Sequence, residues 1–311
     1  MRSAARPSAS RRTDGAPPVS AFADVAAALA QALGSDVAPR PEAAVHGGSI
    51  NDCYRWQGAA GPVFVKCCDV SRGWILEAEA DGLSRLAKAI RVPAVRAAGI
   101  AGRQAFLALE WIELRSPDAR AERRLGEALA RLHRVTADAF GLERDNAIGA
   151  TSQSNGPTTD WVAFWRERRL GAQLNLAACN GYGGRLQERG QRLLERVGDF
   201  FIDYRPAPSL LHGDLWAGNR AIRADGAPVV FDPAVYFGDR EADLAMTRLF
   251  GGFGADFHAA YAAEWPLDAG IAARRDLYNL YHVLNHLNLF GGGYRAQAEA
   301  MIDRLLAATG N

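Results

Sequence analysis

The sequence predicts an α+β fold of two lobes, in which a small antiparallel sheet with one helix precedes a larger, mainly helical lobe. Three observations lead to this prediction. Short apolar runs separated by glycine-containing turns fill the first third of the chain, as in antiparallel strands. Apolar residues at helical spacing dominate the remainder, and one hairpin near residue 220 interrupts them. We expect a disordered tail at 1–20, a first lobe at 21–112 and a second lobe at 113–311.

The first two strands are expected at 43–46 and 53–56, with a glycine-containing turn between them. Glycine lets backbone N–H groups approach phosphate oxygens closely, so the turn is a candidate phosphate-binding loop. An ordinary hairpin without a ligand is the alternative. The candidate residues of this turn are Gly47, Gly48, Ser49 and Asn51.

A third strand is expected at 61–66, and it ends at Lys66. A lysine at the end of an apolar strand can pair with phosphate oxygens of a nucleotide, although many such lysines are only solvated charges. The following helix, at about 74–88, carries an apolar stripe formed by Ile75, Leu83 and Leu86. Glu79 lies on this stripe and Glu77 does not. A buried carboxylate needs a cationic partner, so we expect Glu79 to pair with Lys66.

The apolar run 105–112 predicts the last strand of the first lobe, which leads into a hinge near residue 112. The backbone of such a hinge can hydrogen-bond an adenine edge while apolar side chains cover a ring face. Glu110, Trp111 and Ile112 are therefore candidate nucleotide-binding residues. A buried core strand explains the same run equally well.

The hairpin near residue 220 is expected to consist of strands at 219–223 and 228–232. If Asp225 and Gly226 form a two-residue turn, Asn219 lies opposite Asp232. Opposed residues have Cβ atoms roughly 4.5–5.5 Å apart, which brings an amide oxygen and a carboxylate together. Oxygen ligands of this kind suit Mg²⁺. Asn219 and Asp232 are therefore candidate metal ligands.

Asp214 lies in the loop that enters this hairpin, within His212-Gly213-Asp214. A carboxylate there can accept the proton of a hydroxyl group that attacks a phosphate. The pattern H-x-D, with Asn five residues later and a second Asp beyond it, resembles the catalytic and metal loops of kinase-like phosphotransferases. Each residue alone also has a structural explanation, as a turn cap or a strand end. Together they predict a kinase that uses ATP and Mg²⁺, with Asp214 as its catalytic residue.

With these motifs in order, the chain resembles the fructosamine kinase and ketosamine-3-kinase family, relatives of the aminoglycoside phosphotransferases with a protein-kinase-like fold. The resemblance extends from about Gly47 to Tyr294, and the segments that carry it include Arg240–Met246, Leu249–Phe253 and Asn285–Gly291. Its most specific parts are Trp216 within the catalytic loop Leu211–Asn219 and the segment Phe231–Ala234. It implies phosphorylation of the 3-hydroxyl of ribulosamine or fructosamine adducts on amines or protein lysines. The phosphorylated adduct then decomposes and releases the amine, so the implied role is repair of glycation.

The resemblance has two departures and leaves several residues with open roles. Asp239 replaces a histidine of many relatives, and Ser49 replaces a cysteine of some. We expect Asp243 to accept backbone hydrogen bonds that rigidify the catalytic loop. Trp216 and His286 are candidate substrate-binding residues. The alternatives are that the tryptophan packs the loop onto the core and that the histidine is a surface or capping residue.

Composition restricts the classes of partner. The net charge of +1 and the lack of a basic block argue against nucleic-acid binding. No apolar run is long enough to span a membrane. The four cysteines form no C-x-x-C pair, which indicates reduced thiols and a cytoplasmic enzyme. The sequence does not indicate the oligomeric state. The Arg- and Ser-rich start also permits a transit peptide, although a tail or an upstream start codon fits it better.

Two other functions remain possible on the sequence alone. The same catalytic residues would serve a kinase for another hydroxyl or amino-sugar substrate. A catalytically silent module that binds a nucleotide or sugar is the third interpretation, and the presence of all five kinase-type residues argues against it.

Overall fold

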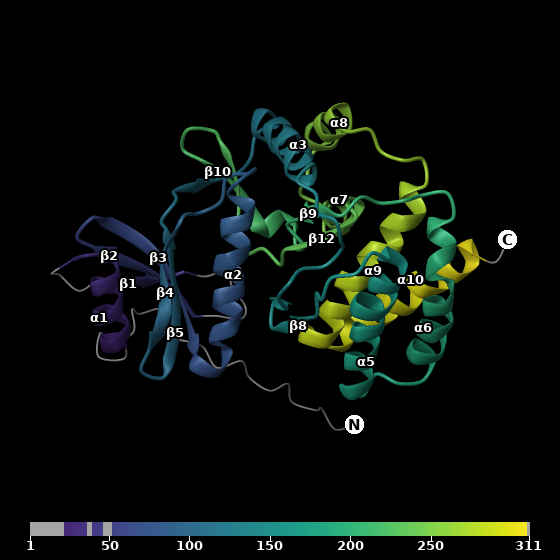
Figure 1. Ribbon diagram of the computed structural model, residues 1–311, viewed down its shortest axis with the longest axis horizontal. Coiled ribbons are helices and arrows are strands. Elements are labelled where there is room, and N and C mark those ends of the chain that lie inside the picture. Colours follow the sequence, from purple (N-terminus) through teal and green to yellow (C-terminus); the bar gives the residue numbers. More distant parts are fainter. Residues whose placement is uncertain (1–21, 36–38, 46–51, 310–311) are drawn as a thin grey trace, which may run out of the picture. The chain divides into compact units, whose positions relative to one another are not determined.

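The computed structural model describes residues 22–35, 39–45 and 52–309, and the chain divides into two compact units (Figure 1). The first unit extends to Gly73 and also contains Arg96–Trp111. The second unit contains Trp74–Val95 and everything from Ile112 onward.

The first unit is built on one five-stranded sheet with the strand order β1-β2-β3-β5-β4. Neighbouring strands β1 and β2, β2 and β3, and β3 and β5 pair antiparallel. Helix α1, Ala23–Ala32, packs on this sheet. The strands are β1 Arg40–Ala44, β2 Asp52–Gly58, β3 Gly61–Asp69, β4 Val95–Ala101 and β5 Gln104–Glu110.

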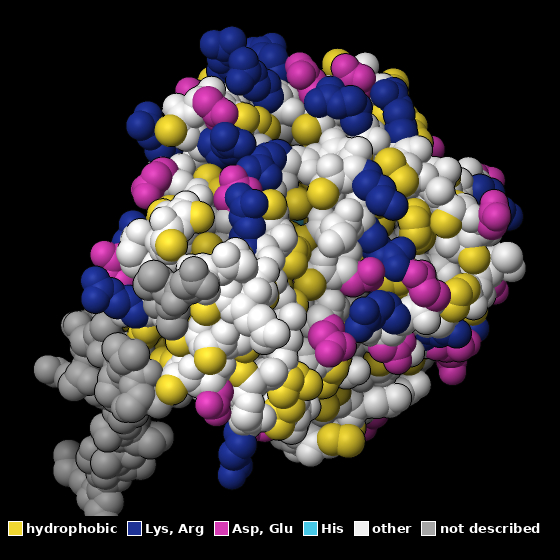
Figure 2. Space-filling model, turned by 60° about the vertical axis from the view of Figure 1, so that its left-hand side comes forward, with side chains coloured by type: hydrophobic (Ala, Val, Ile, Leu, Met, Phe, Trp, Pro, Cys, Tyr) yellow, Lys and Arg dark blue, Asp and Glu magenta, His cyan; other side chains and the backbone are white. Residues whose placement is uncertain are grey.

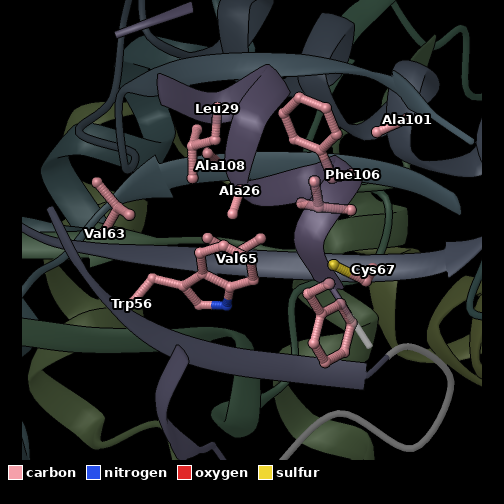
Figure 3. Packing of buried hydrophobic residues seen from close by; sticks show 11 residues of the cluster. Ala26, Leu29, Trp56, Val63, Val65, Cys67, Ala101, Phe106 and Ala108 are labelled. Carbon is pink, nitrogen blue, oxygen red and sulfur yellow. The ribbon is translucent and has the colours of Figure 1, made fainter. Parts of the chain in front are cut away.

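An apolar core joins α1 to the sheet (Figure 3). Leu29 and Ala26 of the helix face Trp56 of β2 and Val65 of β3, and all four side chains are buried. Strand β3 lies between β2 and β5, and its inward residues alternate with outward ones. The central position of β3 in the sheet fixes the backbone at Lys66, which pairs with Cys53 on one side and Leu107 on the other.

The predicted strands of this unit need adjustment at their ends. The strand expected at 43–46 is β1, which begins at Arg40 and ends at Ala44. The strand expected at 53–56 extends over the whole of β2. The expected strand at 105–112 ends at Glu110, because residues 111–113 have no regular structure. The turn with Gly47, Gly48, Ser49 and Asn51 lies outside the described residues, as does the expected tail at 1–20.

The second unit is mainly helical and carries three small sheets. A π-helical stretch, Trp165–Gly171, connects α4 to α5. The helices are α2 Gly73–Leu86, α3 Ala119–His133, α4 Trp161–Phe164, α5 Ala172–Cys179, α6 Arg185–Arg196, α7 Glu241–Leu249, α8 Ala255–Glu264, α9 Ile271–Phe290 and α10 Arg295–Ala308.

The small sheets of the second unit hold the segments around the predicted catalytic loop. The first has the order β11-β10-β6, the second pairs β12 with β9, and the third pairs β7 with β8. The strands are β6 Leu114–Arg115, β7 Asn146–Ile148, β8 Thr151–Gln153, β9 Ser209–Leu211, β10 Arg220–Arg223, β11 Pro228–Val230 and β12 Tyr236–Gly238.

The hairpin of β10 and β11 has a register different from the predicted one. Arg220 pairs with Val230, so Asn219 lies opposite Phe231 and not opposite Asp232. The turn consists of the three residues 224–226, since the Arg223 N–H donates to the Ala227 carbonyl at 2.9 Å. Within it the Gly226 N–H donates to the Arg223 carbonyl at 2.9 Å, and Gly226 has a φ of +77°. This is a type I turn followed by a left-handed residue, a common alternative to the two-residue turn.

No helix among the described residues is long and apolar enough to cross a membrane. On the face in Figure 2, Lys and Arg side chains are interspersed with Asp and Glu side chains, in agreement with a net charge of +1.

Candidate active site

Asp243 holds the predicted catalytic loop by its backbone. The two carboxylate oxygens accept the N–H groups of His212 at 2.7 Å and Gly213 at 2.8 Å. Asp243 is the third residue of α7 and is 1% exposed, so these bonds are shielded from water. The expected backbone hydrogen bonds from the catalytic loop to Asp243 are therefore confirmed.

His133, from α3, completes the clamp from the other side. Its Nε2 lies 3.1 Å from the Asp243 carboxylate and its Nδ1 lies 2.8 Å from the Tyr261 hydroxyl. Burial lowers the pKa of His133, and it also lowers the pKa of His212. Burial raises the pKa of Asp243, but its interactions with His133, with His212 and with the Gly213 N–H together lower the pKa more, so the net shift is downward. His133 is therefore a buried residue that supports Asp243.

Gly213 permits a close approach between the catalytic loop and the segment after Asp232. It has a φ of +83°, and a Cβ atom at this position would lie 2.0 Å from the Ala234 carbonyl oxygen. The Ala234 N–H in turn donates to the His212 carbonyl at 2.9 Å. A side chain at residue 213 would separate the two segments that carry Asp214 and Asp232.

The side chain of Asn219 joins these two segments despite the shifted register. Its amide nitrogen donates to the Asp214 carbonyl at 2.8 Å, to the Asp214 carboxylate at 3.2 Å and to the Asp232 carbonyl at 3.4 Å. Asp232 has a φ of +55°, the only positive value for a non-glycine residue in the described part of the chain. This left-handed backbone bends the chain after β11, so the predicted convergence of Asp214, Asn219 and Asp232 occurs by a different route.

The electrostatics of Asp214 reflect this convergence. Burial and then the charge of Asp232 raise the pKa of Asp214 to about 7, while the hydrogen bond from Asn219 acts in the opposite direction. A second negative group close to Asp214 therefore makes its charged form costly.

The residues at this site fit a hard divalent cation. The Asn219 side chain makes its hydrogen bonds through the amide nitrogen, which leaves the amide oxygen to bind a cation, and Asp232 supplies a carboxylate. A cation held by these oxygens would relieve the repulsion that raises the pKa of Asp214. The donor set is the one that Mg²⁺ prefers.

The candidate nucleotide-binding residues are distributed over both units. Lys66 of β3 is 5% exposed in the first unit, and Glu79 of α2 is 8% exposed in the second. Glu79 thus lies on the buried face of α2 as predicted, whereas the Glu77 side chain is 63% exposed and lies 4.0 Å from Arg144. The pairing of Lys66 with Glu79 stays a prediction.

The expected hinge lies where the two units divide. Glu110 and Trp111 end the first unit and Ile112 begins this part of the second. The Arg55 guanidinium lies 5.2 Å from the centre of the Trp111 ring. Nucleotide binding by these three residues also stays a prediction.

Trp216 and His286 occupy different surroundings in the second unit. The Trp216 side chain lies against Gly218, where an added Cβ would be 2.2 Å from the ring, and the residue is 38% exposed. His286 is half-buried, and its Nδ1 lies 2.8 Å from the His282 carbonyl. Its ring contacts the partly exposed aromatic rings of Phe250, Phe290 and Tyr294.

A buried polar network that no sequence pattern predicted holds the segment that follows Asp232. Gln153 donates to the Asn146 side chain at 2.8 Å and to the Ala234 carbonyl at 3.3 Å, and Asn146 donates to the Val235 carbonyl at 2.7 Å. Tyr281 donates to the Gln153 side chain at 2.7 Å. Gln153 lies within β8 and is buried, and the polar composition of this part of the sequence gives no signal for its burial.

Asp239 is also structural. It is fully buried, and its carboxylate accepts the hydroxyls of Tyr278 at 2.6 Å and Tyr204 at 3.0 Å. Burial and the charge of Glu241 raise the pKa of Asp239 to about 6. The Asp239 side chain thus holds α9 through Tyr278 and the first residue of α7 through the Glu241 N–H.

Comparison with known proteins agrees with the geometry. The model of the fructosamine kinase family matches residues 21–308. The chain is 41% identical to a protein named "Probable ketoamine kinase" from Synechocystis sp. over 91% of this chain and 96% of that protein. It is 40% identical to the chloroplastic protein-ribulosamine 3-kinase of Arabidopsis thaliana over 84% of this chain and 81% of that protein.

A solved structure shows the same fold. The crystal structure of a candidate fructosamine-3-kinase from Haemophilus somnus 129PT has a TM-score of 0.84 and 30% identity, over 92% of this chain and 97% of that one. The predictions of a two-lobe α+β fold and of a phosphotransferase are confirmed. The chain therefore belongs to the fructosamine kinase family, as its motifs indicated.

Proposed function

We propose that the protein transfers the γ-phosphoryl group of ATP to the 3-hydroxyl of ketosamines, with ribulosamine and fructosamine adducts as the substrate class. The observation that carries this proposal is the convergence of Asp214, Asn219 and Asp232 on a loop clamped by Asp243. This arrangement provides one carboxylate for the acceptor hydroxyl and separate oxygens for a cation. The names of the relatives support the choice of substrate class.

Asp214 is the residue that orients the acceptor hydroxyl and takes its proton. Its backbone is fixed through His212 and Gly213, and its carboxylate is oriented by the Asn219 amide at 3.2 Å. A positioned base of this kind contributes to the transfer mainly through geometry. Mg²⁺ bound by Asn219 and Asp232 would supply charge neutralisation for the phosphate oxygens.

The remaining candidate residues divide between the nucleotide and the acceptor. We assign Lys66, supported by Glu79, to the phosphates, the Gly47–Asn51 turn to the same phosphates, and 110–112 to the adenine. Trp216 and His286 are assigned to the ketosamine, since their aromatic rings can stack on a sugar face or enclose its amine. We also propose a cytoplasmic location, because the four cysteines are free thiols.

Release of ADP in the presence of Mg-ATP and ketosamines tests the proposal. Ribulosamine, erythrulosamine and fructosamine adducts are compared with choline and an aminoglycoside. We expect turnover with ketosamines only, and a loss of at least about 10³-fold in kcat for Asp214→Asn with ATP binding retained. Turnover restricted to the comparison alcohols would contradict the ketosamine assignment. ATP binding without any turnover would indicate a silent binding module.

A further inference from the structure

Arg220 is a buried cation that begins β10, directly after the candidate metal ligand Asn219. Its side chain is 4% exposed, and its Nη1 lies 2.5 Å from the Glu122 carboxylate of α3. The Glu122 side chain is 10% exposed. Burial of two charges is costly unless additional hydrogen bonds satisfy them. The other contacts of Arg220 and Glu122 therefore indicate the structural role of the pair.

Both charged groups also bind the same loop, Phe250–Gly254, which connects α7 to α8. Arg220 donates to the Gly252 carbonyl, and its guanidinium lies 4.2 Å from the centre of the Phe253 ring. Glu122 accepts the Gly254 N–H at 3.3 Å. The ion pair therefore joins a strand, a helix and a loop, and the loop is held at three successive residues.

This loop lies directly against the catalytic turn. Gly252 has a φ of +89°, and a Cβ atom there would lie 2.5 Å from the Cβ of Ala217. Ala217 begins the 3-10 turn that ends at Asn219. At the other end of the loop, the Phe250 ring is 4.9 Å from the His286 ring. The loop thus contacts both the turn that carries Asn219 and the candidate acceptor-binding residue His286.

We propose that Arg220 is a positioning residue, which through Glu122 anchors the Phe250–Gly254 loop against the catalytic turn and so sets the position of Asn219 and of the acceptor-binding rings. This inference rests on the proposed function for its kinetic consequence, but the anchoring itself does not. If the anchor is lost, the acceptor side of the site shifts. The nucleotide-binding residues of the first unit keep their positions within that unit.

Two variants separate positioning from simple stabilisation. Arg220→Met removes the anchor and leaves the Glu122 charge buried without its partner. The double variant Arg220→Met/Glu122→Met removes the anchor and both charges, so it should recover much of the lost thermal stability. Ile302→Ala, in the buried face of α10, provides a control that is destabilised away from the turn.

Steady-state kinetics and hydrogen exchange are measured on the wild type and these variants. We expect kcat/KM for the ketosamine to fall by about 10- to 100-fold in the single and the double variant, through a lower kcat and a higher KM for the ketosamine. The KM for ATP should change less than the KM for the ketosamine, because Lys66, Glu110 and Trp111 belong to the first unit and Asn219 contributes only through the cation. Arg220→Lys, which retains the charge without the fork, should show an intermediate loss. Ile302→Ala should show no such change in kcat or in the KM for the ketosamine.

Hydrogen exchange gives a readout that does not depend on the reaction. Peptides that cover 215–219 and 250–254 should exchange faster in Arg220→Met and in Arg220→Met/Glu122→Met, and their exchange should not change in Ile302→Ala. Unchanged exchange in these peptides, or wild-type kinetics in the double variant, would overturn the inference. Absence of wild-type turnover on ketosamines, with faster exchange in the variants, would refute the proposed function and leave the anchor standing.

Discussion

At the scale of single residues, two side chains hold the backbone of the catalytic loop and of the segment at Asp232 in place. Asp243 binds two consecutive N–H groups of the catalytic loop, and Asn219 binds the carbonyls of both Asp214 and Asp232. Backbone groups held from two sides have little freedom, so the Asp214 carboxylate is positioned before a substrate arrives. The motif spacing predicted which residues converge, because it is a property of the local chain.

His282 gives a pH-dependent prediction at the same scale. It is 4% exposed on α9, and burial followed by the charge of His286 lowers its pKa to about 3. The histidine of the unfolded chain therefore takes up a proton as the pH falls below 6.5, whereas that of the folded chain stays neutral until about pH 3. The free energy of unfolding falls as the pH decreases between these two values. Asp214 and Asp239, whose pKa values are raised, act with the opposite sign, so a variant is needed to isolate the histidine.

The measurement is urea unfolding of the wild type and of His282→Gln at pH 7 and pH 5. The substitution should reduce the loss of unfolding free energy between the two pH values by up to about 2 kcal/mol, which is the linkage contribution of one such histidine. An equal loss in both proteins would show that His282 is protonated in the folded state.

At the scale of elements, helix α3 both packs tightly on α8 and carries two residues that support the candidate active site. Its Gly126 lies against α8, where an added Cβ would be 2.3 Å from the Phe257 carbonyl oxygen. The same helix supplies His133 to the Asp243 clamp and Glu122 to the loop anchor. The helical spacing of apolar residues predicted helices for this part of the chain, but it does not indicate which residues of a neighbouring helix each helix contacts.

Gly126→Ala should therefore push α3 and α8 apart. We expect a loss of about 1–3 kcal/mol in unfolding free energy, as for other overpacked interfaces, and a lower kcat because the contact between His133 and Tyr261 is disturbed. Gly183→Ala is the matched control, since a Cβ there meets nothing within 4 Å. Thermal unfolding compares the two, and equal stability of both variants would contradict the close packing.

At the scale of the whole molecule, the order of the elements and the two-lobe class were predictable, and the detailed register was not. The period of apolar residues distinguishes strands from helices, and it placed β3, α2 and the hairpin correctly along the chain. The hairpin register depended on whether Gly226 took a left-handed conformation after a type I turn, which Asp-Gly permits but does not require. The Gln153 network and the Arg220 anchor arise from contacts between distant segments, which no local pattern encodes.

We propose that this fold directs phosphoryl transfer to one hydroxyl of a ketosamine. The most direct measurement is phosphorus and proton NMR of the product made from Mg-ATP and a ribulosamine adduct, with Asp214→Asn as the control. We predict a single product with phosphorus coupled to the proton on carbon 3, and no product from the variant. Phosphorylation at another hydroxyl, or an equal yield from Asp214→Asn, would contradict this account.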